Sequence, residues 1–184
     1  MMHTDAGRDR DDEARALGEA VAAIYRRADA AMRDLPIYNS ALSVAALGFR
    51  EVDGVVLGIV VTPWFMNLVR VPPPGEAALP PGTGVPRALP VGVLDFTVAM
   101  LDGVGTIESC SLVSPMYDFV DQQQAEATAL AALAVVLAPP ENTVSSAAGQ
   151  QTADSTGSTS PDTAAPPSLD RRRFLRGALA ERRP

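Results

Sequence analysis

The sequence has no lysine, a single histidine, a single cysteine and few aromatic residues among its 184 positions. One cysteine, Cys110, excludes an internal disulfide and any metal site built from several cysteines. The histidine, His3, lies in a polar segment, where a Ser-His-Asp or Cys-His catalytic group has no folded surroundings to hold it in place. We therefore expect no catalytic residues, no metal and no cofactor.

Long apolar runs are also missing. The first residues, MMHTDAGRDRDDEAR, mix both charge signs and lack the apolar stretch of a secretory signal. The most apolar run, residues 129–140, is far shorter than the roughly 20 residues that cross a bilayer. A single cysteine also agrees with a reducing compartment. We expect a cytoplasmic protein without stable membrane insertion.

Charge is unevenly distributed along the chain. Residues 1–168 contain nine arginines against twenty acids, whereas residues 169–184 contain six arginines against two acids. An acidic body repels a phosphate backbone, which argues against nucleic acid as a partner. The same body attracts a peptide that carries arginines.

Apolar periodicity predicts the elements of the first half. Steps of three and four residues over 11–35 predict an amphipathic helix that ends before Pro36. Alternation from residue 41 and the run VVLGIVV predict two antiparallel strands, joined by a tight turn at Asp53-Gly54. A third extended segment, WFMNLVRV, follows at 64–71. The first half of the chain is therefore predicted to contain one helix followed by three extended segments.

The second half adds a hairpin and a helix. Residues 93–101 and 105–113 predict two strands around Asp102-Gly103, and residues 118–138 return to helical spacing before two prolines. The segment at 72–90 is too rich in proline and glycine for a regular element. The sequence thus predicts an α+β fold, a mainly antiparallel sheet of four to five strands with N- and C-terminal helices packed on one face.

The domain boundaries follow from composition. Residues 1–10 are expected to be a flexible N-terminus, and residues 11–140 an α+β domain. Residues 141–168 are rich in Ser, Thr, Ala, Gly and Pro, which is typical of a disordered linker. Residues 169–184 form a basic tail.

Three segments are too particular to be scaffold alone: LPIYNSALSVAALGF (35–49), TPWFMNLVRVP (62–72) and SCSLVSPMYDFVDQ (109–122). In this order and at this spacing they resemble the HybE family, also known through HupJ-type proteins, which are accessory chaperones of nickel-iron ([NiFe]) hydrogenase assembly. The resemblance covers residues 35–138. The second and third segments are its most specific parts.

The resemblance implies an α+β domain without catalytic activity that acts on a hydrogenase before export. Its implied partners are the small subunit precursor, which carries a twin-arginine signal peptide, and the large subunit that holds the nickel-iron centre. Some relatives contain a fused rubredoxin-like domain, but one cysteine cannot supply the paired metal ligands of such a domain. An iron-binding or electron-transfer role is therefore not expected.

The candidate partner-binding residues come from the two most specific segments: Trp64, Phe65, Met66, Asn67, Ser114, Pro115, Met116, Asp118 and Asp121. The aromatic and methionine side chains either fill the core or form a surface that accepts an apolar peptide. Asn67 either satisfies local backbone groups or contacts a bound strand. Asp118 and Asp121 either favour the dipole of the last helix or receive guanidinium groups of a signal peptide.

The basic tail reads DRRRFLRGALAERRP, in which Arg171, Arg172, Phe174, Leu175 and Arg176 resemble the twin-arginine consensus. No hydrophobic run follows, so the tail cannot serve as an export signal. It is either a frayed basic end or an imitation of the client's signal peptide that occupies the chaperone's own site.

The interpretation that joins these observations is a non-enzymatic cytoplasmic chaperone. It would hold an immature hydrogenase subunit, or the signal peptide of the small subunit, until maturation is complete. Two alternatives remain: an enzyme that uses Cys110 as its nucleophile, and a scaffold module that only forms a homo-oligomer, for example a dimer.

Overall fold

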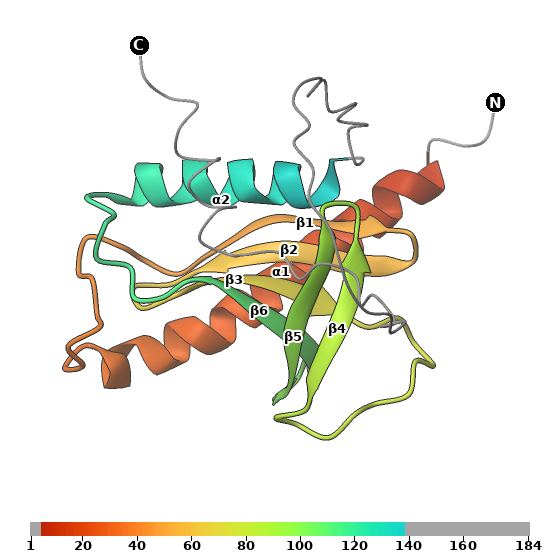
Figure 1. Ribbon diagram of the computed structural model, residues 1–184, viewed down its shortest axis with the longest axis horizontal. Coiled ribbons are helices and arrows are strands. Elements are labelled where there is room, and N and C mark those ends of the chain that lie inside the picture. The colour runs from red at the N-terminus through yellow and green to blue at the C-terminus, as the bar shows by residue number, and fades with distance from the viewer. Residues whose placement is uncertain (1–4, 139–184) are drawn as a thin grey trace, which may run out of the picture.

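The computed structural model describes residues 5–138, which form two helices and six strands (Figure 1). In chain order these are α1 (Asp5–Met32), β1 (Ala45–Val52), β2 (Val55–Val61), β3 (Met66–Val71), β4 (Gly84–Leu89), β5 (Gly92–Leu101), β6 (Gly105–Val113) and α2 (Gln122–Leu137). No helix of the described part is long and apolar enough to cross a membrane. The predicted linker and tail lie outside the described residues.

One antiparallel sheet contains all six strands in the order β1-β2-β3-β6-β5-β4, which confirms the α+β class. The expected count of four to five strands was wrong because β4 lies in the proline-rich segment assigned to a loop. β4 is an edge strand that pairs only with β5. An edge strand tolerates Pro86, since a proline there does not interrupt a ladder on both sides.

The two helices cover opposite faces of the sheet, not one face as expected. Ile59 and Val61 of β2 pack in a cluster with α2, whereas Val60 between them packs with Val21 of α1. Successive side chains of a strand point to opposite faces. The sheet therefore lies between α2 and α1, as Figure 1 shows.

A bulge in β1 lets both helices approach this edge of the sheet. The register with β2 shifts between Leu47 and Arg50, and Gly48 has a φ of 63°. A Cβ at Gly48 would lie 2.4 Å from a Leu133 methyl carbon of α2, so only glycine fits. The next residue, Phe49, packs its ring against Gly18 of α1 on the other face. The two adjacent residues thus anchor different helices.

The helix boundaries differ from the expected ones at both ends of the domain. α1 begins at Asp5, so the expected flexible N-terminus is helical from there on, and α1 ends four residues before Pro36. α2 begins at Gln122 rather than at 118. Its N-cap is Asp121, whose carboxylate accepts a hydrogen bond from Gln124 N at 2.7 Å. Asp121 thus lies at the N-terminus of the last helix, where a carboxylate caps the helix and favours its dipole.

Candidate functional site

The three distinctive segments meet at one end of the molecule, where Asn39 joins them. Its Nδ2 donates to the carbonyl oxygens of Met116 (2.9 Å) and Phe119 (2.8 Å). Its backbone N donates to Pro63 O at 2.8 Å, and its Oδ1 accepts from Ala41 N at 3.0 Å. The side chain and the backbone N–H of one residue therefore hold the loop after α1, the β2–β3 turn and the loop before α2 in a fixed arrangement.

The β2–β3 turn is organised by Thr62, which is fully buried. The backbone N and the hydroxyl of Thr62 both donate to Phe65 O, at 2.8 and 3.1 Å. The hydroxyl oxygen also accepts from Trp64 N (3.2 Å) and Phe65 N (2.9 Å). The threonine and proline of the TPW motif thus close a tight turn that presents two consecutive aromatic side chains.

Those two aromatic side chains pack inside this end of the molecule. Trp64 is only 6% exposed and stacks on Tyr38 with ring centroids 6.2 Å apart and planes at 22°. Phe65 meets Trp64 edge to face, and Tyr25 of α1 meets Phe65 in the same way at 5.2 Å. Because Trp64 is buried, its packing role is the one that the structure shows.

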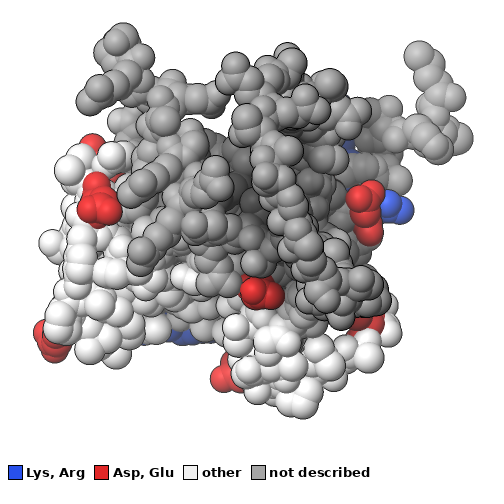
Figure 2. All heavy atoms as spheres, in the orientation of Figure 1, with Lys and Arg blue, Asp and Glu red and all other residues white. Residues whose placement is uncertain are grey.

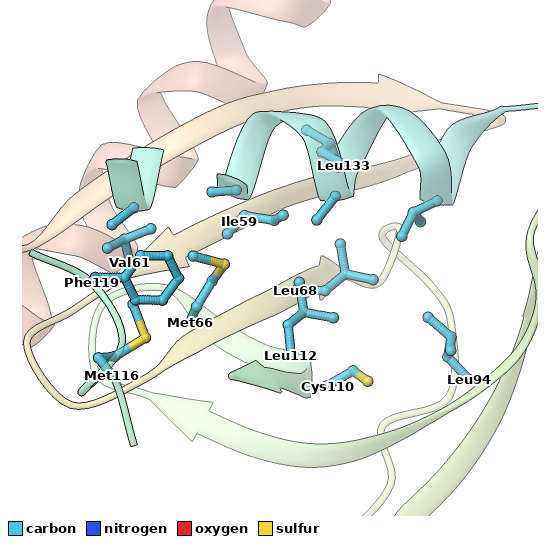
Figure 3. Packing of buried hydrophobic residues seen from close by; sticks show 14 of the residues in the cluster. Ile59, Val61, Met66, Leu68, Leu94, Cys110, Leu112, Met116, Phe119 and Leu133 are labelled. Atoms are coloured by element: carbon cyan, nitrogen blue, oxygen red, sulfur yellow. The ribbon is translucent and has the colours of Figure 1, made fainter. Parts of the chain in front are cut away.

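Met66 and Met116 are fully buried in the core between α2 and the sheet. Figure 3 shows Met116 and Phe119 pointing toward Val61 and Met66 in that layer. Both methionines therefore position the turn and the loop from inside, and neither side chain is available at the outer surface.

Asn67 lies on the face of the sheet opposite α2, between Val60 of β2 and Ser111 of β6. Its Oδ1 is buried without a hydrogen-bond partner among the described residues. Asn67 was expected either to satisfy local backbone groups or to contact a bound strand. The first role does not account for its side-chain carbonyl oxygen.

The outer surface of this end combines exposed apolar and acidic side chains. Leu35, Tyr117 and Val120 are 42%, 58% and 76% exposed, and the Tyr117 hydroxyl donates to Pro36 O at 3.0 Å, which ties their two loops together. We call this surface the acidic corner and define it as residues 34–44, 62–65 and 114–121. These ranges contain no arginine or lysine.

The acids of the acidic corner are Asp34, Asp118 and Asp121, all exposed. Figure 2 shows acidic atoms and no basic ones at the left edge of the view, where these loops lie. Ser114 and Pro115 are exposed as well, and the Ser114 hydroxyl donates to Trp64 O at 3.4 Å. The structure therefore brings most of the predicted site residues together, with the polar ones outside and the apolar ones inside.

A hollow of about 610 Å³ is lined by the end of α1 and by residues of the acidic corner between Tyr38 and Val44. Arg33 donates twice to Asp29, at 3.1 and 2.9 Å, and the Tyr38 hydroxyl donates to the same carboxylate at 2.9 Å. The hydrogen bond from Arg33 lowers the pKa of Asp29, while desolvation and then the bond to Asp29 raise the pKa of Tyr38. The positive charge of Arg33 is thereby paired with the carboxylate of Asp29.

A buried ion cluster lies outside the predicted site and was not foreseen. Arg70 and Glu108 are cross-strand neighbours, with side chains 9% and 3% exposed and 3.0 Å apart. Arg70 also pairs with Glu76 at 2.7 Å, and Arg87 bonds to both glutamates. The hydrogen bond from Arg70 lowers the pKa of Glu76. Two unlike charges within apolar strands were the only sequence signal for this cluster.

Cys110 is 1% exposed and belongs to the core beneath α2. Within residues 5–138, no group of three or more histidine, cysteine or acidic residues is placed to hold a metal ion. His3 and the tail residues Arg171, Arg172, Phe174, Leu175 and Arg176 lie outside the described residues.

Comparisons with known proteins agree on one family. Residues 16–177 match the family described as "[NiFe]-hydrogenase assembly, chaperone, HybE". The hydrogenase expression/formation protein HupJ of Bradyrhizobium diazoefficiens is 44% identical over 174 residues, 94% of this chain and 95% of the relative. HoxT of Azotobacter vinelandii is 46% identical over 125 residues, 67% of this chain and 81% of the relative. The solution structure of HybE from Escherichia coli superposes with a TM-score of 0.56 at 26% identity, covering 79% of this chain and 91% of that one.

Proposed function

The chain belongs to the HybE family of nickel-iron hydrogenase assembly chaperones, and on that premise we propose that it is a non-enzymatic cytoplasmic chaperone. Its client is the small subunit precursor of a nickel-iron hydrogenase, recognised through the twin-arginine signal peptide before export. The large subunit is a further partner. The acidic corner is the surface that receives the client.

The observation that carries this proposal is the convergence at the acidic corner. Three segments far apart in sequence are held together by Asn39, and two of them, the loop after α1 and the loop before α2, present exposed apolar side chains beside acids. A twin-arginine segment has the complementary character, because paired guanidinium groups are followed by apolar residues. Guanidinium pairs well with carboxylate, and exposed apolar patches on soluble domains commonly mark interaction sites.

The nine candidate residues take two roles in this proposal. The buried ones, Trp64, Met66 and Met116, hold the turn and loop in place. Asp118 and Asp121 pair with the client's arginines at the surface. Ser114 and Pro115 belong to the exposed loop that leads to them, and Phe65 and Asn67 are half buried beside the same turn.

Removing the two charges without disturbing the fold tests this proposal. Asp118→Asn with Asp121→Asn is the variant of choice, because asparagine also caps helices well and leaves α2 intact. An exposed ion pair is worth about 0.2–1 kcal/mol, so losing two raises the Kd for the precursor by roughly 2- to 30-fold. Calorimetric titration with the precursor measures it, at two salt concentrations, since screening over about 8 Å weakens such pairs.

A matched control removes two exposed acids elsewhere. Asp9 and Asp102 lie in α1 and in the β5–β6 turn, outside the acidic corner. The double change Asp9→Asn with Asp102→Asn alters the net charge by the same amount and should leave the Kd within twofold, as an order-of-magnitude expectation for distant charges. If both double variants weaken binding of the precursor equally, the effect is one of net charge, and the acidic corner is not the client-binding surface.

The competing thiol-enzyme reading places the chemistry at Cys110. Burial of the thiol supports a packing role, because a reactive cysteine needs an accessible, electropositive site. Iodoacetamide labelling across pH separates the two. Fast labelling of the native protein, half-complete well below the free-thiol pKa of about 8.5, would favour the enzyme.

A further inference from the structure

The solvent side of α2 is unusually apolar. Leu130 and Val135 are 49% and 40% exposed, and the exposed positions between them, Ala131 and Ala134, are alanines. The opposite side of the helix is buried on the sheet through Ala125, Ala129, Leu133 and others. From Ala127 to the end of α2 there is no charged residue at all. An amphipathic helix normally turns a polar face to water.

Two more exposed apolar side chains lie in the acidic corner, just before the polar first turn of α2. Val120 and Tyr117 precede the first turn of α2 and are the most exposed large apolar side chains of the described residues. The first turn of α2 exposes Gln123 and Gln124, and beyond it the apolar surface runs along the rest of the helix to Val135, on the side that faces away from the sheet in Figure 1. We call it the α2 band and define it as Tyr117, Val120, Ala127, Leu130, Ala131, Ala134 and Val135.

Charge is placed at one end of the α2 band only. Asp118, Asp121 and Glu126 lie at or before its second turn, and no acid follows in the helix. No arginine or lysine occurs anywhere in residues 88–138. A ligand that lies along the band therefore meets negative charge at the N-terminal end of α2 and uncharged apolar surface at the C-terminal end.

We propose that the client segment lies along α2 in one orientation, with its paired arginines at the N-terminal end of the helix and its apolar run on the α2 band toward Val135. This inference rests on the proposed function and specifies the site and polarity of client binding. The lengths agree: 16 helical residues span about 24 Å, and the 7–15 residues of a signal's apolar region span roughly 10–22 Å as a helix. The α2 band thereby binds the apolar part of the client, which the acidic side chains of the acidic corner cannot bind.

Two spin labels on the full-length protein test the orientation. Gln123→Cys and Ala134→Cys place single thiols on the exposed side of α2, about 16 Å apart along the axis. The native cysteine is buried, so it contributes little labelling. The probe is a synthetic peptide with two adjacent arginines followed by an uncharged apolar run. A nitroxide at 134 should broaden the apolar resonances of the peptide more than the arginine resonances, and a nitroxide at 123 should do the reverse.

Surface substitutions give a second readout. Leu130→Gln with Val135→Gln keeps good helix formers in α2 but makes the band polar, and we expect a roughly tenfold rise in the peptide's Kd. Met100→Gln is the matched control, because Met100 is 56% exposed on β5, away from the band. The Kd of that control variant should stay within about twofold.

The outcomes separate the two proposals. A peptide that does not bind at all overturns both the proposed function and this inference. A peptide whose arginine resonances are broadened by the label at 123, while the label at 134 does not broaden its apolar run, leaves the acidic corner in place and overturns the α2 band. A peptide that binds but that neither label broadens, or that is broadened in the reverse order, overturns the acidic corner and the α2 band together. If the label at 134 instead broadens residues 174–179 of the free protein and the peptide leaves this unchanged, the chain's own tail occupies the band and the inference fails.

Discussion

Asn39→Ala should loosen the acidic corner. The change removes three side-chain hydrogen bonds, those to Met116 O, Phe119 O and from Ala41 N. Each contributes a net 0.5–1.5 kcal/mol, so we expect the free energy of unfolding to fall by about 1.5–4.5 kcal/mol. That is a large fraction of the roughly 5–15 kcal/mol that stabilises a typical domain.

Urea unfolding followed by tryptophan emission is a suitable assay, because Trp64 is the only tryptophan and lies in the same corner, stacked on Tyr38. Ser40→Ala, at the exposed neighbouring position, is the control and should cost less than about 0.5 kcal/mol. Asn39→Asp keeps the acceptor for Ala41 N but turns a carboxylate toward two carbonyl oxygens. Its stability should be lowest at neutral pH and recover on acidification, when the carboxyl group gains a proton to donate.

The reasoning would be refuted by an Asn39→Ala protein that unfolds within 0.5 kcal/mol of the parent, a threshold on the order of a neutral surface substitution, with unchanged Trp64 emission. In that case the three segments are held together by apolar packing alone. The two donated bonds would then be incidental to the architecture of the corner.

Three further predictions concern the ion cluster and the tail. Glu108→Gln leaves Arg70 buried beside a weakened partner and should cost about 3–5 kcal/mol, whereas Glu19→Gln at an exposed pair should cost under about 1 kcal/mol; urea unfolding compares them. The pKa of Glu76 is lowered in the folded state, so its contribution to stability is present above the ordinary glutamate pKa of about 4.3 and is lost as pH falls through the lowered value. Glu76→Gln should therefore reduce the dependence of stability on pH in that range, as measured by thermal unfolding. Deleting residues 169–184 should raise the affinity for a twin-arginine peptide if the tail competes for the site, and an unchanged Kd would remove that role.

Local turn chemistry made the two hairpins predictable. Asp-Gly pairs at 53–54 and 102–103 supply the backbone conformations that a tight turn requires, and both hairpins are confirmed. β4 was missed because the composition of its segment is typical of loops, and only its place at the sheet edge makes Pro86 acceptable.

The sequence of β2 already indicated that helices cover both faces of the sheet. β2 reads VVLGIVV and is buried at every position from Leu57 to Val61. A strand that is apolar on both faces indicates that both faces are covered. The expectation of one covered face therefore neglected what β2 already indicated.

The candidate site residues lie close together in the structure, but which of them are buried was not predictable. Side chains such as Trp64 and Met116 serve equally well in a core and on a binding surface, and nothing in sequence decides between them. The role of Asn39 depends on carbonyl groups 77 and 80 positions away. The Arg70–Glu108 pair depends on the register of two strands that are joined only by the fold. Such contacts follow from tertiary structure rather than from local pattern.

The most direct test of the central claim is an NMR titration of the full chain with the twin-arginine peptide. The account predicts that amide shift changes concentrate in residues 34–44 and 114–124, extend along α2 to Val135, and weaken as salt is added. Shift changes centred instead on β4 and the cluster around Arg70 and Glu76, or spread evenly over the sheet, would contradict the acidic corner as the client-binding surface.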